Sequence, residues 1–142
     1  NTAIAIQESM TCLSSLKTSQ DQMDYVHDLF SQLGRVAVVD EKLMDASTVL
    51  GACGIAFALR YIRASIQGGI EIGFDAKTAA LIAAQTVKGA AELLIQKGAH
   101  PEQEIDKVTT PKGCTIAGLN EMEHRGFSSS LIMGIKASYD RI

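Results

Sequence analysis

Apolar and small residues recur with helical spacing over the last hundred residues of the chain. Along residues 43–65 they return every three or four positions, which predicts one face of a long helix. The glycines at 68, 69 and 73 are expected to break the chain. Asp75 can then cap a second, alanine-rich helix over 76–96, which ends at Gly98. The face of the first helix comprises Leu43, Ser47, Leu50, Gly54, Phe57, Tyr61 and Ser65.

Three shorter helices are predicted after these two. Pro101 suits the first turn of a third helix, because proline lacks the amide that a first turn leaves unpaired. A fourth helix is expected over 115–124. Ser128 or Ser129 caps a fifth, whose apolar stripe comprises Leu131, Ile135, Ser138 and Ile142.

The first forty residues show a different pattern. Residues 3–6 and 10–13 are interpreted as a strand, and the β-branched run at 35–39 as another. Between them, Ser19 caps a helix that Gly34 ends. Its apolar positions at helical spacing are Met23, Val26, Phe30 and Leu33.

Composition favours closely packed helices over a β-sandwich. The 142 residues are 46% hydrophobic but only 5% aromatic, with no Trp. The net charge of −3 and the absence of a basic stripe argue against a nucleic-acid or anionic-membrane partner. No apolar run is judged to approach the ~20 residues of a membrane span, and no signal peptide is recognised.

The cysteines and histidines indicate neither a disulfide framework nor a metal site. Cys12, Cys53 and Cys114 are odd in number and far apart, which fits reduced thiols in the cytoplasm. Three histidines, equally scattered, are expected at the surface or at helix caps: His27, His100 and His124. The small-residue face around Cys53 and Gly54 predicts tight helix packing.

The segment with the strongest indication of chemistry is 108–119. Pro111 starts a turn, and Gly113 lets the backbone bend and leaves room for a close approach. The amides of Gly113, Cys114 and Thr115 are expected to face outward at a helix N-terminus, which suits a carboxylate or phosphate. The alternative is a capped helix start with nothing bound, in which Thr115 is an N-cap.

This segment resembles the signature of pyrroline-5-carboxylate reductase, the NAD(P)H-dependent last enzyme of proline synthesis. Lys112 departs from that signature, which usually has a second glycine there, and 50–57 lacks the family's serines, proline and tyrosine. The resemblance continues through 41–46, 84–91, 100–102 and 125–127. The residues that fit the signature are Thr109, Thr110, Pro111, Gly113, Cys114, Thr115 and Ile116.

The resemblance implies a mainly α fold: an interlocking helical dimerisation domain like the C-terminal domain of 6-phosphogluconate dehydrogenase. Residues 42–142 would form that domain, and 1–41 the trailing strand–helix–strand of a Rossmann-type dinucleotide-binding domain. It also implies a homodimer or higher oligomer, with NADP or NAD bound mainly by an upstream half. The chain has no G-x-G-x-x-G motif, so alone it is expected to be inactive.

The resemblance also implies a role for each loop residue. The Thr115 hydroxyl would bond the ring nitrogen of the substrate and serve as the catalytic group. Thr110, Gly113 and Cys114 would form the pocket for the pyrroline carboxylate, chiefly through the backbone. Lys112 either adds attraction for that carboxylate or for a cofactor phosphate, or is simply solvated.

Three alternatives stay open. Cys114 at a helix N-terminus can be a nucleophile, but hydride transfer needs no covalent intermediate. The chain can instead be a non-catalytic helical dimerisation module. It can also belong to a reductase of a different cyclic imine or of a 3-hydroxy acid.

Overall fold

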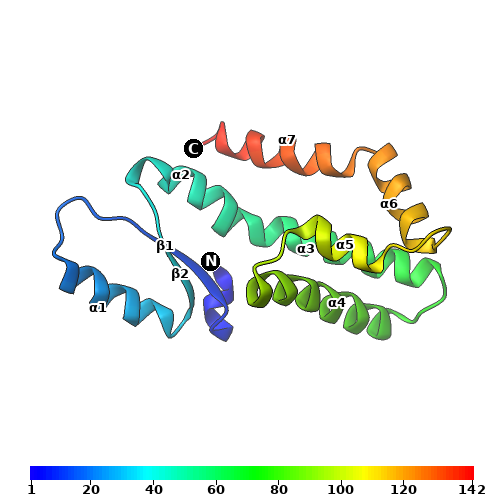
Figure 1. Ribbon diagram of the computed structural model, residues 1–142, viewed down its shortest axis with the longest axis horizontal. Coiled ribbons are helices and arrows are strands. Elements are labelled where there is room, and N and C mark those ends of the chain that lie inside the picture. Colours follow the sequence, from blue (N-terminus) through cyan, green and yellow to red (C-terminus); the bar gives the residue numbers. More distant parts are fainter. The chain divides into compact units, whose positions relative to one another are not determined.

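The computed structural model describes residues 1–142, whose contacts divide into two compact units. The first unit comprises Asn1–Ala58 together with Ile132–Ile142, and the second comprises Leu59–Leu131. Figure 1 shows the order of the elements along the chain. The boundary predicted between residues 41 and 42 from the sequence therefore falls inside the first unit.

The first unit contains a two-stranded parallel sheet with one crossover helix. The strands pair in register from Ser9 opposite Gly34 to Leu13 opposite Val38. This confirms the predicted strand–helix–strand, except that the residues before the first strand form a 3₁₀ helix and no strand. The Asn1 side chain explains the difference, because its Oδ1 accepts from the Ala3 amide at 3.1 Å and starts a helical turn. The elements are η1 (Thr2–Ile6), β1 (Ser9–Leu13), α1 (Gln20–Ser31) and β2 (Gly34–Val38).

Helix α1 is delimited by the residues that the sequence indicated. Ser19 Oγ accepts from the Gln22 amide at 3.3 Å, while the Gln22 side chain accepts from the Ser19 amide at 3.0 Å. These reciprocal bonds form a capping box. At the start of β2, Gly34 has φ +143°, and a β-carbon there would overlap the Ser9 backbone. Only glycine allows β2 to pair this closely with β1.

A long, nearly continuous helical stretch follows β2. It begins with η2 (Glu41–Leu43) and α2 (Met44–Ser47), passes through a π-helical segment, η3 (Thr48–Cys53), and continues as α3 (Gly54–Glu71). The break predicted at residues 68 and 69 is therefore wrong. A β-carbon at Gly69 would lie 3.2 Å from the Ala79 β-carbon, so this glycine permits a close approach of two helices.

The next three helices start within one residue of the prediction, but the last begins at Phe127, so Ser128 and Ser129 lie inside it and the cap predicted there is wrong. Asp75 caps α4 by accepting from the Lys77 and Thr78 amides at 3.0 Å, and Gly98 follows its last residue. His100 caps the next helix, where its Nδ1 accepts from the Glu102 amide at 3.3 Å. The elements are α4 (Ala76–Lys97), α5 (Pro101–Val108), α6 (Cys114–His124) and α7 (Phe127–Tyr139).

Few apolar side chains are buried within the single chain. The buried apolar residues are Val49, Ala79 and Ala83, while many leucines and isoleucines are exposed. Two helical stretches, Glu41–Glu71 and Ala76–Lys97, are long and apolar enough to cross a membrane by length and composition. The sequence-based statement that no apolar run approaches that length is thus wrong. Both helices present apolar faces that the chain itself leaves uncovered.

Candidate functional site

The segment between α5 and α6 forms a tight turn. The Gly113 amide donates to the Thr110 carbonyl oxygen at 3.0 Å, with Pro111 and Lys112 at the two central positions. Lys112 has φ +59°, the left-handed conformation that the third residue of a type II turn requires. The turn therefore keeps the shape that a glycine at 112 would give it, and the lysine takes up the strain.

Gly113 is fixed by the turn itself. A β-carbon there would stand 2.6 Å from the Thr110 hydroxyl oxygen and 3.0 Å from the Thr110 carbonyl oxygen. The close approach predicted for this glycine is thus made by the chain's own backbone. Because its amide is bonded within the turn, the expectation that it faces outward toward a ligand is wrong.

The N-terminus of α6 carries no side-chain cap. Gly113 occupies the N-cap position with φ −72° and ψ 159°, so Cys114 and Thr115 are the first two helical residues. The interpretation of Thr115 as an N-cap is therefore wrong. Cys114 is exposed and Thr115 is half-buried. With no side chain bonded to the first turn, α6 presents the partial positive charge of a helix start.

Most polar side chains of the loop form no hydrogen bond or ion pair within the protein. Only one of its threonine hydroxyls has a partner in the protein: Thr109 Oγ1 donates to the Ile105 carbonyl oxygen at 2.8 Å. The hydroxyls of Thr110 and Thr115 make no such bond, and none of the ion pairs involves Lys112. The loop thus presents a cation and two hydroxyls beside an uncapped helix start.

Helix α5, directly before the loop, carries an ion pair along its side. Lys107 Nζ lies 2.5 Å from Glu104 Oε1. The hydrogen bond from Lys107 lowers the pKa of the Glu104 carboxyl below its usual value. The Lys107 charge is thereby engaged with Glu104, whereas the Lys112 charge in the loop forms no ion pair.

Sequence reasoning missed a cavity in the first unit. The cavity, of about 490 Å³, lies between the sheet and the helical stretch that follows it. A β-carbon at Gly51 would meet nothing within 4 Å, and one at Gly54 would lie 3.9 Å from the Val49 carbonyl oxygen, so the chain itself leaves space beside this small-residue face. The departure of 50–57 from the family pattern was the one signal in the sequence. Lining residues include Asn1, Met10, Cys12, Gly51, Gly54 and Ile55.

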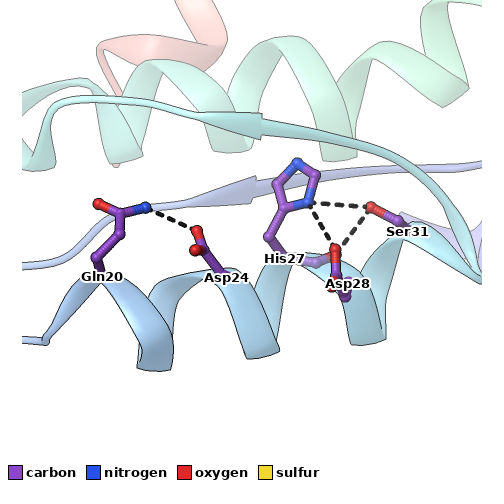
Figure 2. A network of polar contacts seen from close by, with 5 residues as sticks. All are labelled: Gln20, Asp24, His27, Asp28 and Ser31. Atoms are coloured by element: carbon purple, nitrogen blue, oxygen red, sulfur yellow. Dashed lines mark hydrogen bonds and ion pairs between the residues drawn. The ribbon is translucent and has the colours of Figure 1, made fainter.

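The histidines form no site. His27 lies on α1 with Nδ1 3.7 Å from Asp28 Oδ1 and 3.4 Å from Ser31 Oγ, as Figure 2 shows. All the residues labelled in this view belong to α1. His100 caps α5. The predicted capping or surface role of these two histidines is confirmed.

Comparison with known proteins identifies the helical part of the chain. The family model described as pyrroline-5-carboxylate reductase dimerisation matches residues 41–142. The chain is 52% identical to pyrroline-5-carboxylate reductase 1 of Dictyostelium discoideum, over 99% of this chain and 28% of that protein. It is 39% identical to the pyrroline-5-carboxylate reductase of Synechocystis, over 99% of this chain and 53% of that protein. The chain thus spans about a quarter to half the length of these relatives.

Solved structures agree with the sequence relatives. A 1-pyrroline-5-carboxylate reductase from Streptococcus pyogenes matches with a TM-score of 0.91 and 30% identity, over 99% of this chain and 55% of that one. The Plasmodium falciparum pyrroline carboxylate reductase, solved with NADP bound, matches with a TM-score of 0.90 and 25% identity, over 99% and 57%. The predicted helical fold is confirmed.

Proposed function

Because the chain belongs to the pyrroline-5-carboxylate reductase family, we propose that it is the C-terminal, dimerising part of an enzyme of proline biosynthesis. That enzyme reduces 1-pyrroline-5-carboxylate to L-proline with NADPH or NADH. The observation that carries this proposal is the match of the dimerisation family over 41–142, which includes the loop described above.

The loop supports a role in holding the substrate. The substrate carboxylate lies at the uncapped start of α6, where the amides of Cys114 and Thr115 favour an anion. The free ammonium of Lys112 adds to this attraction. Thr110 and Gly113 shape the pocket through their turn, in which the Gly113 amide closes the bend. The exposed Cys114 thiol takes no covalent part.

Thr115 is the residue that we assign to the reacting end of the substrate. Its hydroxyl, free of protein partners, accepts a hydrogen bond from the protonated ring nitrogen and so orients the C=N bond. A hydroxyl is a weak acid, so it does not supply the proton itself. The imine enters already protonated, and the nicotinamide cofactor supplies the hydride to the ring carbon.

The residues present here do not form a phosphate-binding site for that cofactor. The connection from β1 to α1 contains no glycine, and the chain has no G-x-G-x-x-G motif. We therefore assign binding of NADP or NAD mainly to another part of the enzyme. NADP is the cofactor in the Plasmodium falciparum structure.

A second copy of the chain is the partner that we propose for the exposed helix faces. Val49, Ala79 and Ala83 are too small a core to account for 46% hydrophobic residues. The family description, dimerisation, fits a homodimer or a higher oligomer. We further propose that the faces of α3 and α4 are covered by protein and not by lipid, and that the enzyme is cytoplasmic.

Binding of L-proline to the loop tests the proposal against a purely dimerising role. Amide resonances of Thr110 and of residues 112–115 are followed by NMR as L-proline is added to the enzyme. Shifts confined to this segment, absent with a linear amino acid of similar charge, support substrate binding. No shift at any concentration would leave only the dimerisation module. Comparing kcat/KM for five- and six-membered cyclic imines then decides the substrate.

A further inference from the structure

The first residue of the chain makes a hydrogen bond across fifty positions. Asn1 Nδ2 donates to the Gly51 carbonyl oxygen at 3.1 Å. The other end of the same amide accepts from the Ala3 amide at 3.1 Å. Asn1 thus caps η1 with one atom and reaches the long helix with the other, and both residues lie in the first unit.

Gly51 belongs to the π-helical segment Thr48–Cys53. In this segment the Gly54 amide donates to the Val49 carbonyl oxygen, five residues back. A π-turn holds one residue more than an α-turn, and π-turns are less stable in isolation. Val49, the most buried apolar residue of the chain, is held within this turn. The segment therefore requires contacts from outside the helix, and Asn1 supplies one.

The state of this turn decides which side chains face the cavity. Gly51, Gly54 and Ile55 line the cavity beside Asn1. If the turn closed into a regular α-helix, the residues after it would rotate by about 100°, the angle of one residue in an α-helix. Gly54 and Ile55 would then leave the cavity wall, and a different face of the helix would oppose the sheet.

We propose that the Asn1 side chain acts as a latch: its hydrogen bond to the Gly51 carbonyl oxygen stabilises the π-turn and thereby fixes which face of the helix is turned toward the sheet. The π-turn is the element with two arrangements, and the bond from Asn1 Nδ2 to Gly51 favours one of them. Asn1 is a positioning residue in this role, and the role is independent of the reaction proposed above.

Three substitutions separate the bond from Asn1 to Gly51, the latch, from the bond that Asn1 accepts from the Ala3 amide, the cap. Asn1→Asp keeps an oxygen for the Ala3 amide but has no donor for Gly51. Asn1→Ser also keeps the cap, without adding charge, and is too short to reach Gly51. Asn1→Ala loses both bonds. A residue that acts only as a cap would tolerate the first two changes.

Hydrogen–deuterium exchange on the complete enzyme measures the result. We expect Asn1→Ser and Asn1→Asp to speed amide exchange across 48–55 by about three- to tenfold, the effect of one lost hydrogen bond, with the Ala3 amide still protected. Asn1→Ala should expose both segments. Exchange across 48–55 that changes only in Asn1→Ala, or in no variant, would overturn the proposal.

Native thiols give a second readout. Cys53 lies in the π-turn and is half-buried, whereas Cys114 is exposed on α6. Labelling of Cys53 by a thiol reagent should become faster in Asn1→Ser, while labelling of Cys114 stays unchanged as the internal control. An unchanged Cys53 rate in that variant would also contradict the latch.

Discussion

The Thr110 hydroxyl oxygen lies where a β-carbon on Gly113 would approach it to 2.6 Å. This contact restricts the side chains that residue 113 of the proposed substrate loop can carry. An alanine at 113 would force the Thr110 hydroxyl to move and would crowd the Thr110 carbonyl oxygen, which accepts the bond from the amide of residue 113.

Gly113→Ala should therefore lower kcat/KM for the pyrroline by at least about tenfold, since the start of α6 is displaced and about 1.4 kcal/mol of substrate binding is lost. Gly118→Ala is the matched control. A β-carbon at Gly118 meets nothing within 4 Å, and alanine favours the helix interior. Steady-state kinetics of both variants check this. Equal activities would show that the turn does not position the substrate.

Thr115→Ala should lower kcat/KM by roughly ten- to a hundredfold, or about 1.4–2.7 kcal/mol, because one hydrogen bond to the ring nitrogen is lost. Thr115→Ser retains the hydroxyl and should retain most of the activity. Since Gly113 holds the N-cap position, the loss cannot be attributed to a missing cap. Parent-like kinetics in Thr115→Ala would remove Thr115 from the reaction.

Lys112→Gly should have two separable effects. The turn loses a left-handed lysine, so the protein should gain up to about 1 kcal/mol of stability. If the ammonium attracts the substrate carboxylate, KM should rise a few-fold at low salt and much less at high salt. Lys112→Asn removes the charge but tolerates the same φ, so it should show the same KM effect. A KM that falls would indicate that the lysine obstructs the loop.

Asp75 gives a pH-dependent stability. Its hydrogen bonds to Thr78 lower the pKa of the carboxyl below its usual 3.8. The stabilisation is therefore present above about pH 3.8 and is lost as pH falls through the lower, folded-state pKa. The Tm of Asp75→Asn should be below that of the parent at neutral pH and converge with it in acid. Asp75→Ser and Asp75→Asn both cap the helix without titrating, so the difference between their two Tm values should not change with pH.

The chain should sediment as a dimer at micromolar concentration without detergent, because α3 and α4 present uncovered apolar faces that a second copy would bury. Mixing with neutral lipid vesicles should leave the protein in solution. A folded monomer would contradict the assignment of these faces to a second copy. Co-sedimentation with vesicles would instead support a membrane role for the two helices.

Local signals made most helix starts predictable. Ser19, Asp75 and Pro101 each mark a start through a cap or a missing amide, and those assignments hold. The break predicted at Gly69 is wrong because a glycine at a close contact between helices cannot be told, from the sequence alone, from a glycine that ends a helix. The π-turn contains Gly51, which is bonded to Asn1 fifty residues away. No pattern within a short window of sequence contains that bond.

The turn and the helix start of the candidate site were predictable from the sequence. Which backbone amides of the loop are free to bind a ligand was not predictable. Pro111 and Gly113 indicate a bend, yet only the backbone geometry shows that the Gly113 amide is bonded within it. The left-handed φ of Lys112 was likewise hidden, because lysine seldom adopts it.

The left-handed turn at residue 112 has a practical consequence for protein engineering. Residue 112 must keep the left-handed φ that the turn requires, and its side chain is exposed. An exposed position of this kind is suited to carry a reporter group or a charge of either sign next to the proposed carboxylate pocket. Substitutions by residues that tolerate the left-handed φ, such as asparagine, would measure the local electrostatic potential with the least change in the backbone of the loop.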